Sequence, residues 1–184
     1  MSPYDLTVLL HIILVILWLG GGLALLVGAE VMRRKRGPAA LLVVVDIVAL
    51  LGPGYFVPIS ILTLLSGVAA AWMGPGFGEL WVILGIAGFA ATFLTGILVL
   101  KPRAEKLAAL TIGGETPQGT LVGQADNLIV IARFDYVILF LVVAVMALKP
   151  AATDIVTLSA MVVIAAVGAL LTIVKGMRGE AATA

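Results

Sequence analysis

The only histidine of the chain, His11, stands seven residues before Trp18 in a long apolar stretch. In a helix this spacing brings the two side chains within about 20° of each other, with Gly22 farther along the same face. An imidazole at membrane depth has three interpretations: a buried group hydrogen-bonded to a neighbouring backbone or hydroxyl group, an axial haem ligand, or part of a copper or proton path. The first is favoured, because one isolated histidine is a weak sign of a metal.

Haem b is the best candidate cofactor among the alternatives, with His11 as the candidate metal ligand. One histidine per chain cannot give bis-histidine ligation, so haem requires His11 with a methionine, a five-coordinate iron, or two copies sharing one haem. Gly22 leaves room for a macrocycle on the same face. Copper alone is less well supported, because the chain has no cysteine and its methionines form no close cluster.

A second group of polar residues, Arg133, Asp135 and Tyr136, stands near the start of another apolar stretch. Helical spacing puts Arg133 and Tyr136 on one face and Asp135 on another, so Arg133 and Asp135 are expected to pair with different helices. The favoured interpretation is structural: these side chains pin helices together and reach toward the membrane surface. The functional alternative is that Arg133 binds an anionic ligand or a haem propionate. Asp46 is the expected partner of Arg133, since both lie near the same membrane boundary.

The chain that positions these groups is too apolar for a soluble protein. Of its 184 residues, 62% are hydrophobic and 11% are charged, against roughly 25% charged in an ordinary soluble domain. Several apolar runs reach the length of about 20 residues that crosses the hydrocarbon layer as a helix. The absence of cysteine excludes disulfides, iron–sulfur clusters and thiolate metal sites. We therefore predict an all-α, polytopic membrane helix bundle in contact with the lipid bilayer.

Five apolar stretches predict five transmembrane helices in a single domain, residues 1–184. The spans are expected at residues 6–32, 39–73, 80–100, 128–148 and 155–174. The second stretch would form a helix of about 52 Å, longer than the hydrocarbon core of about 30 Å, so a kink is predicted at residues 52–54. Its first part, residues 39–51, is apolar on every face except at Asp46. Other helices, other copies of the chain or another subunit must cover it, unless the whole stretch is one strongly tilted helix.

The basic residues set the expected orientation. All 11 lysines and arginines except Arg133 and Lys149 stand at span ends on one side, and such residues are retained in the cytoplasm. Five spans then predict an exported N-terminus and a cytoplasmic C-terminus. The first span is expected to be a retained anchor rather than a signal peptide, because the basic cluster follows it. After Lys101 the chain is expected to continue as a charged helix and to loosen at residues 113–117.

Small residues at four-residue spacing predict where helices approach closely. The two clearest stripes are Gly20, Ala24 and Gly28 in the first span, and Gly88, Thr92 and Gly96 in the third. Both stripes are expected to pack inside the bundle. The first helix would then present His11, Trp18 and Gly22 on a different face.

The string HIILVILWLGG at residues 11–21 resembles the first helix of small bacterial membrane proteins related to copper-resistance protein D and the HemJ-type protoporphyrinogen oxidase. Residues 56–58 and 64–67 are similar to the second helix of that group. The string MALKP at residues 146–150 resembles an uncharacterised branch of it, the predicted integral membrane proteins of unknown function. The resemblance implies a helical bundle in a bacterial inner membrane and raises the haem interpretation of His11. It carries no enzyme activity over, because the HemJ-type enzymes depend on a histidine beyond the first helix.

Three functional hypotheses follow. The first is a non-catalytic membrane subunit or scaffold that assembles with itself or with a larger membrane complex. The second is a haem-b-binding redox or porphyrin-handling protein with His11 as axial ligand, and the third is a small metal or proton transporter using Asp46, Arg133 and Asp135. The sequence contains no hydrolase triad, phosphate-binding loop, zinc signature or nucleic-acid-binding face. No nucleic acid is therefore expected as a partner, and a non-catalytic role is favoured while enzyme activity stays open.

Overall fold

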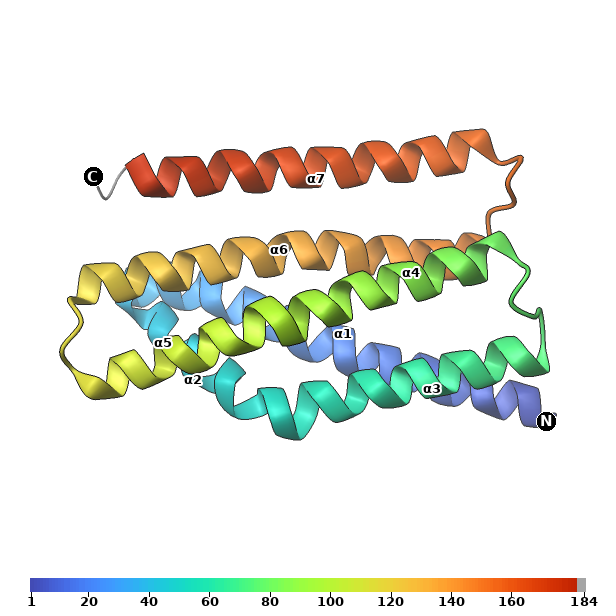
Figure 1. Ribbon diagram of the computed structural model, residues 1–184, viewed down its shortest axis with the longest axis horizontal. Helices are drawn as coiled ribbons and strands as arrows, with labels where there is room; N and C mark the ends of the chain where they lie inside the picture. Colours follow the sequence, from blue (N-terminus) through green and yellow to red (C-terminus); the bar gives the residue numbers. More distant parts are fainter. Residues whose placement is uncertain (182–184) are drawn as a thin grey trace.

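Long helices run side by side along the molecule, and a computed structural model describes residues 1–181, with side chains as far as Thr172 (Figure 1). The α-helices are α1 (Pro3–Arg36), α2 (Leu41–Leu51), α3 (Val57–Met73), α4 (Leu80–Thr95), α5 (Lys101–Gly113), α6 (Gln118–Leu148) and α7 (Ile155–Ala181). A short 3-10 segment, η1 (Pro38–Ala40), precedes α2, while the π-helical segments η2 (Gly52–Phe56) and η3 (Gly96–Leu100) join α2 to α3 and α4 to α5. No strand occurs in this part of the chain.

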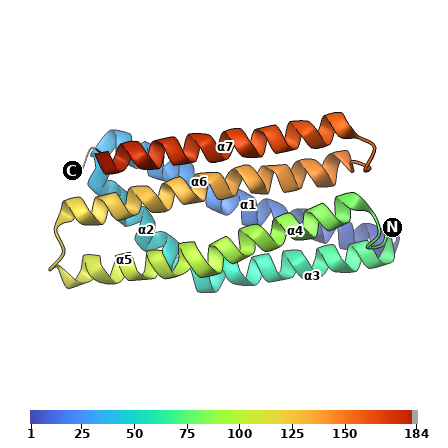
Figure 2. The ribbon, with the colours of Figure 1, turned by 45° about the horizontal axis from the view of Figure 1, so that its top comes forward.

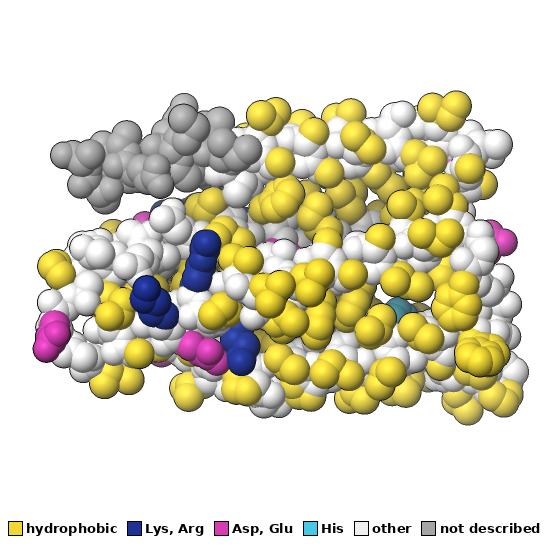
Figure 3. Space-filling model, viewed as in Figure 1, with side chains coloured by type: hydrophobic (Ala, Val, Ile, Leu, Met, Phe, Trp, Pro, Cys, Tyr) yellow, Lys and Arg dark blue, Asp and Glu magenta, His cyan; other side chains and the backbone are white. Residues whose placement is uncertain are grey.

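Five helical segments are long and apolar enough to cross a membrane. They are Pro3–Arg36, Pro38–Met73, Leu80–Gly113, Gln118–Leu148 and Ile155–Thr172. Apolar side chains cover much of the visible surface, whereas lysine and arginine gather over the end where α5 lies (Figure 3). We call this the basic end of the bundle. An apolar exterior of this extent suits contact with lipid rather than water. The predicted all-helical, multi-pass membrane architecture is therefore confirmed.

The helices continue past the apolar spans at the basic end. The third span runs on through α5 to Gly113, and α6 begins at Gln118 rather than at residue 128, so only residues 114–117 form the connection. Gly114 makes this turn possible because its φ is +70°, a left-handed conformation that suits glycine. The length of an apolar stretch reflects the thickness of the hydrocarbon layer, whereas the helix itself can continue beyond that layer.

A buried cluster holds the helices together at the basic end. We call it the basic-end core, and its members come from α1, α2, α5 and α6: Ala29, Leu41, Leu42, Val44, Val45, Ala104, Leu107, Leu121, Ala125, Leu128 and Ile129. Four residues of the apolar segment 39–51 belong to this cluster. One face of the apolar α2 packs against α1, α5 and α6 of its own chain, whereas Val43, Ile47 and Leu50 on its other side stay exposed.

Two helices are interrupted by π-helical turns. In η2 the N–H of Val57 bonds to the carbonyl of Gly52, and in η3 the N–H of Lys101 bonds to that of Gly96. Pro53, within η2, has no N–H to donate, so the α-helical bonding pattern cannot continue there. The predicted kink at residues 52–54 coincides with η2. The sequence analysis did not anticipate η3.

The helices pack around α1 and α6. α1 lies against α3, while α4 and α7 both pack on α6. α7 runs along the outer side of α6 in both ribbon views (Figures 1 and 2). α3 and α4 make few contacts with each other. This sparse contact leaves space inside the bundle between the two interrupted helices.

Of the two predicted small-residue stripes, only Gly88 and Thr92 pack against a neighbour as expected, whereas a Cβ at Gly96 would meet nothing within 4 Å. In α4, a Cβ at Gly88 would collide with Val142 of α6, and Thr92 is buried. In α1, by contrast, a Cβ at Gly20 or Gly28 would meet nothing within 4 Å, and Ala24 is exposed. The expected internal packing of the α1 stripe is therefore wrong within the described residues. The packed face is the opposite one, because side chains of other helices fill the notches beside its glycines.

Candidate functional site

A cavity of about 180 Å³ lies inside the bundle and is partly open to the outside. We call it the central pocket. Its walls come from α1 to α6 and are mostly apolar, with Val48, Ile97 and Ala132 as examples. Both π-helical segments line it, through Gly52 and Gly96 among other residues. π-Helical turns occur frequently at functional sites, and here two of them border the same cavity.

Aromatic rings form one side of the central pocket. Trp18 packs on Phe89 with ring centroids 5.2 Å apart, and Phe89 stacks on Phe93 at 5.6 Å. Trp18 and Gly22 both line the pocket, so the structure brings these two predicted site residues together. The room expected beside Gly22 for a macrocycle is filled, however, because a Cβ at Gly22 would collide with the hydroxyl of Tyr136.

Most hydroxyl groups of the pocket lining are engaged with the backbone. Tyr136 donates to the carbonyl of Leu19 at 2.9 Å, which links α6 to α1. Ser60 and Thr92 donate to carbonyls of their own helices at 2.9 and 3.0 Å. These side chains are therefore satisfied without a ligand, as polar groups at membrane depth must be.

Asp135 is the carboxylate of the pocket lining. Its side chain forms neither a hydrogen bond nor an ion pair with any described residue, in contrast to the hydroxyl groups around it. Lys101 lines the same pocket, but its ammonium group lies 3.5 Å from a carboxylate oxygen of Glu105. Asp135 thus brings an acceptor without a described partner into a mostly apolar cavity.

His11 lies outside the pocket lining and packs on α3. Its Nδ1 is 2.9 Å from the carbonyl oxygen of Thr63 and 3.2 Å from the hydroxyl of Ser66. A carbonyl only accepts, so Nδ1 carries the hydrogen and donates it to Thr63. A Cβ at Gly67 would come within 2.8 Å of the imidazole, so this glycine makes the close approach possible. The geometry matches the interpretation of a hydrogen-bonded imidazole.

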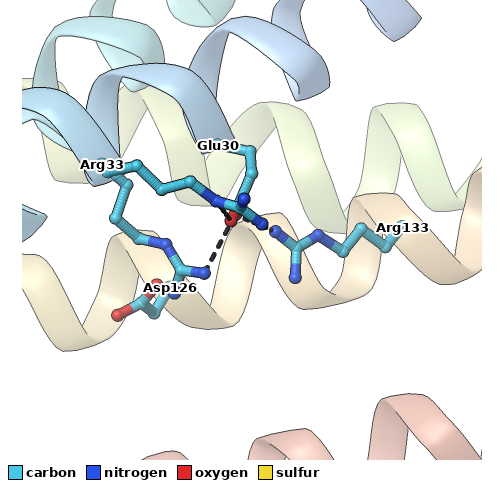
Figure 4. A network of polar contacts seen from close by, with 5 residues as sticks. Glu30, Arg33, Asp126 and Arg133 are labelled. Carbon is cyan, nitrogen blue, oxygen red and sulfur yellow. Dashed lines mark hydrogen bonds and ion pairs between the residues drawn. The ribbon is translucent and has the colours of Figure 1, made fainter.

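Glu30, which the sequence analysis did not single out, is the centre of a charged network at the basic end (Figure 4). One carboxylate oxygen accepts from Arg133 of α6 and from Arg33, both at 2.9 Å, and the other lies 2.6 Å from Nε of Arg34. Arg33 also lies 3.7 Å from a carboxylate oxygen of Asp126. The network ties the end of α1 to α6.

The prediction that Asp46 pairs with Arg133 is therefore wrong, because Arg133 pairs with Glu30. Asp46 forms no ion pair with any residue whose side chain is described. Glu30 stands three residues before Arg33 and four before Arg34, a spacing that favours ion pairs along one helix face. This pattern was present in the sequence and was overlooked. Glu30 binds one amino group of the Arg133 guanidinium, and the binding of an anionic ligand or a haem propionate by Arg133 stays a hypothesis. Of the three residues proposed for transport, Asp46, Arg133 and Asp135, only Asp135 lines the central pocket.

No metal-binding group of three or more histidine, cysteine, aspartate or glutamate side chains occurs in the described part of the chain. A single imidazole and a single carboxylate in separate places do not make a metal-ion cage. A metal ion bound by protein side chains alone therefore has no support in this geometry.

A family model described as predicted integral membrane protein (DUF2269) matches residues 5–150. The matched part runs from the first turn of α1 past the end of α6, so it includes the whole lining of the central pocket. No curated protein and no solved structure matches the chain. The match supports the expected uncharacterised membrane protein family. The relationship to copper-resistance protein D and the HemJ-type enzymes stays a hypothesis.

Replacing Glu30 by glutamine keeps the side-chain shape and removes the negative charge that three guanidinium groups share. We expect a lower melting temperature in detergent, with a loss of about 1 to 2 kcal/mol, because Arg133 then has no carboxylate near the membrane boundary. The matched control is Asp126→Asn, which removes only the longer contact and should cost less than roughly 0.5 kcal/mol.

A double-variant cycle tests the pair itself. Adding Arg133→Gln to Glu30→Gln should recover part of the loss, since the arginine no longer lacks its partner. If the two substitutions are simply additive in thermal unfolding, Glu30 and Arg133 are not coupled.

Proposed function

Because the chain belongs to the DUF2269 family of predicted integral membrane proteins, we propose that it is a non-catalytic subunit of the bacterial inner membrane that holds an apolar ligand in the central pocket. The observation that carries this proposal is the cavity between two interrupted helices. Apolar cavities with a few polar groups are typical of small-molecule sites. Interrupted helices around a cavity are likewise a feature of binding sites at membrane depth.

The polar groups around the pocket favour binding over catalysis. Covalent or acid–base chemistry requires a nucleophile or a base with a second group that orients it. Ser60, Thr92 and Tyr136 donate to backbone carbonyls instead of to one another. Asp135 has no described side chain as a partner that would make it half of a catalytic pair. An apolar ligand, in contrast, needs only the apolar walls.

Filling the pocket tests the proposal. A Cβ at Gly96 meets nothing within 4 Å and the residue lines the cavity, so Gly96→Leu should occupy the space without disturbing the helix. The probe is the neutral photoreactive compound 3-trifluoromethyl-3-phenyldiazirine, applied to the protein in lipid nanodiscs, with labelled residues located by mass spectrometry. We expect labelling of Phe93 in the wild-type protein and a several-fold loss in Gly96→Leu.

The matched control is Ala90→Leu, which adds similar bulk on the exposed face of α4 in the same membrane span. It should leave labelling of Phe93 unchanged, while the lipid-facing Leu94 is labelled equally in all three proteins. Equal labelling of Phe93 in the wild type and Gly96→Leu would mean that the cavity admits no ligand.

A second candidate function is haem binding at His11. The observation that favours it is the hydrogen bond from Nδ1 to Thr63, which leaves Nε2 with no hydrogen bond to any described residue. Metal-bound histidines commonly donate their other ring nitrogen to a carbonyl in this way. Against it, His11 lies outside the central pocket and Tyr136 fills the space beside Gly22.

An optical spectrum of protein purified from haem-replete cells tests this candidate. If His11 is an axial ligand, a Soret band is present and is lost in His11→Ala, whereas Ser66→Ala retains it because the carbonyl of Thr63 still orients the ring. Wild-type protein without a Soret band, or His11→Ala with an unchanged one, rules the ligand out.

Self-association is part of the proposed role as a subunit. The stripe of Gly20, Ala24 and Gly28 on α1 faces no other helix of the described chain. Small residues at this spacing let two membrane helices approach closely. The exposed stripe therefore supports contact between two copies of the chain, or between the chain and a larger membrane complex.

Adding bulk at the centre of the stripe tests self-association. We expect Ala24→Leu to lower the energy transfer between differently labelled copies in lipid vesicles, because the added side chain separates the helices. Ala90→Leu, on the exposed face of α4, should leave the energy transfer unchanged. A wild-type protein that is monomeric in vesicles is incompatible with self-association.

A further inference from the structure

We propose that the central pocket selects ligands that carry a positively charged organic group, such as a protonated amine on an apolar body, and that the Asp135 carboxylate pairs with that group. This inference rests on the proposed ligand-binding function and specifies the chemical class of the ligand. Its starting point is the position of Asp135 in the pocket lining together with its lack of any partner among the described residues.

The neighbouring polar groups do not satisfy this carboxylate. Tyr136, next to Asp135 in sequence, donates its hydroxyl hydrogen to Leu19, and Thr92 across the pocket donates to Phe89. An ionised carboxylate at membrane depth is costly without a partner and typically pairs with another group. A donor or a cation supplied by a ligand removes that cost.

Two basic side chains, one close to Asp135 in sequence and one in the pocket lining, already have carboxylate partners. Arg133, two residues from Asp135, binds Glu30 at 2.9 Å, and Lys101 of the pocket lining lies 3.5 Å from Glu105. Neither forms an ion pair with Asp135. These two cations therefore leave the Asp135 carboxylate to the cavity, and Asp46, another span carboxylate without an ion pair to a described side chain, lies outside the pocket lining.

An organic cation fits the pocket better than a metal ion. Calcium and magnesium require about six oxygen ligands, whereas Asp135 is the one carboxylate of the lining and no cluster of three or more metal-ligating side chains occurs in the described residues. The rings of Trp18 and Phe93 line the same cavity. Aromatic faces attract organic cations, and the apolar walls accommodate the rest of such a molecule.

The test compares two photoreactive probes on the full chain in lipid nanodiscs. One is the neutral 3-trifluoromethyl-3-phenyldiazirine, and the other carries an aminomethyl group on the ring, which is protonated at neutral pH. We expect the amine to label Phe93 several-fold more than the neutral probe does in the wild type. Asp135→Asn should abolish this preference, and Asp135→Glu should retain most of it because the charge is kept.

The neutral probe also shows whether the variants keep the pocket. If it labels Phe93 equally in wild type and Asp135→Asn while the amine shows no preference in the wild type, the charge selectivity is overturned and the proposed ligand-binding function stands. The same conclusion follows if the preference persists in Asp135→Asn. If neither probe labels the pocket of the wild type, the proposed ligand-binding function fails, and the inference fails with it.

Discussion

The need to satisfy every backbone N–H and carbonyl group without water governs this structure. Inside hydrocarbon an unpaired peptide group costs several kcal/mol, so the chain crosses the membrane as helices. The same requirement shapes the two interruptions. η2 and η3 do not open the helix; they retain backbone bonds by moving to a wider π-helical pattern, as the Val57–Gly52 and Lys101–Gly96 bonds show. Both segments line the central pocket, so the helices deviate from regular geometry at the cavity while their backbone stays bonded.

Several charged side chains near the membrane boundary are likewise paired within the protein. At the basic end, one glutamate binds three arginines, and one face of the apolar α2 is buried in the basic-end core. The network therefore fixes α1 against α6 next to the packed residues that hold α2 and α5. Arg133 consequently serves to join helices, in agreement with the structural interpretation of its place in the sequence. Among the described carboxylates inside the spans, Asp46 and Asp135 have no such partner, and of the two only Asp135 lines the cavity.

The sequence predicted the features that depend on lipid thickness and helix periodicity. The five spans follow from apolar length, and the shared face of Trp18 and Gly22 follows from their spacing. Features that depend on which helix lies next to which were not predicted. The choice of Glu30 over Asp46 as partner of Arg133 is a tertiary contact, and α1 uses its Gly22 face rather than its Gly20 face because Tyr136 fills that notch. The π-helical segment η3 was not predicted, because Gly96 was interpreted as part of a small-residue packing stripe.

The distribution of hydrogen bonds also separates the two candidate sites. His11 has a donor contact to Thr63 on a neighbouring helix, an arrangement that is complete as a structural link and also leaves one ring nitrogen for a ligand. Asp135 has no such structural contact with a described residue, so packing alone does not explain a carboxylate at that position. An unpaired charge in an apolar cavity costs stability unless something binds it. The central pocket is therefore our proposed functional site, because a ligand that pairs with Asp135 would remove this cost, whereas His11 is satisfied without one.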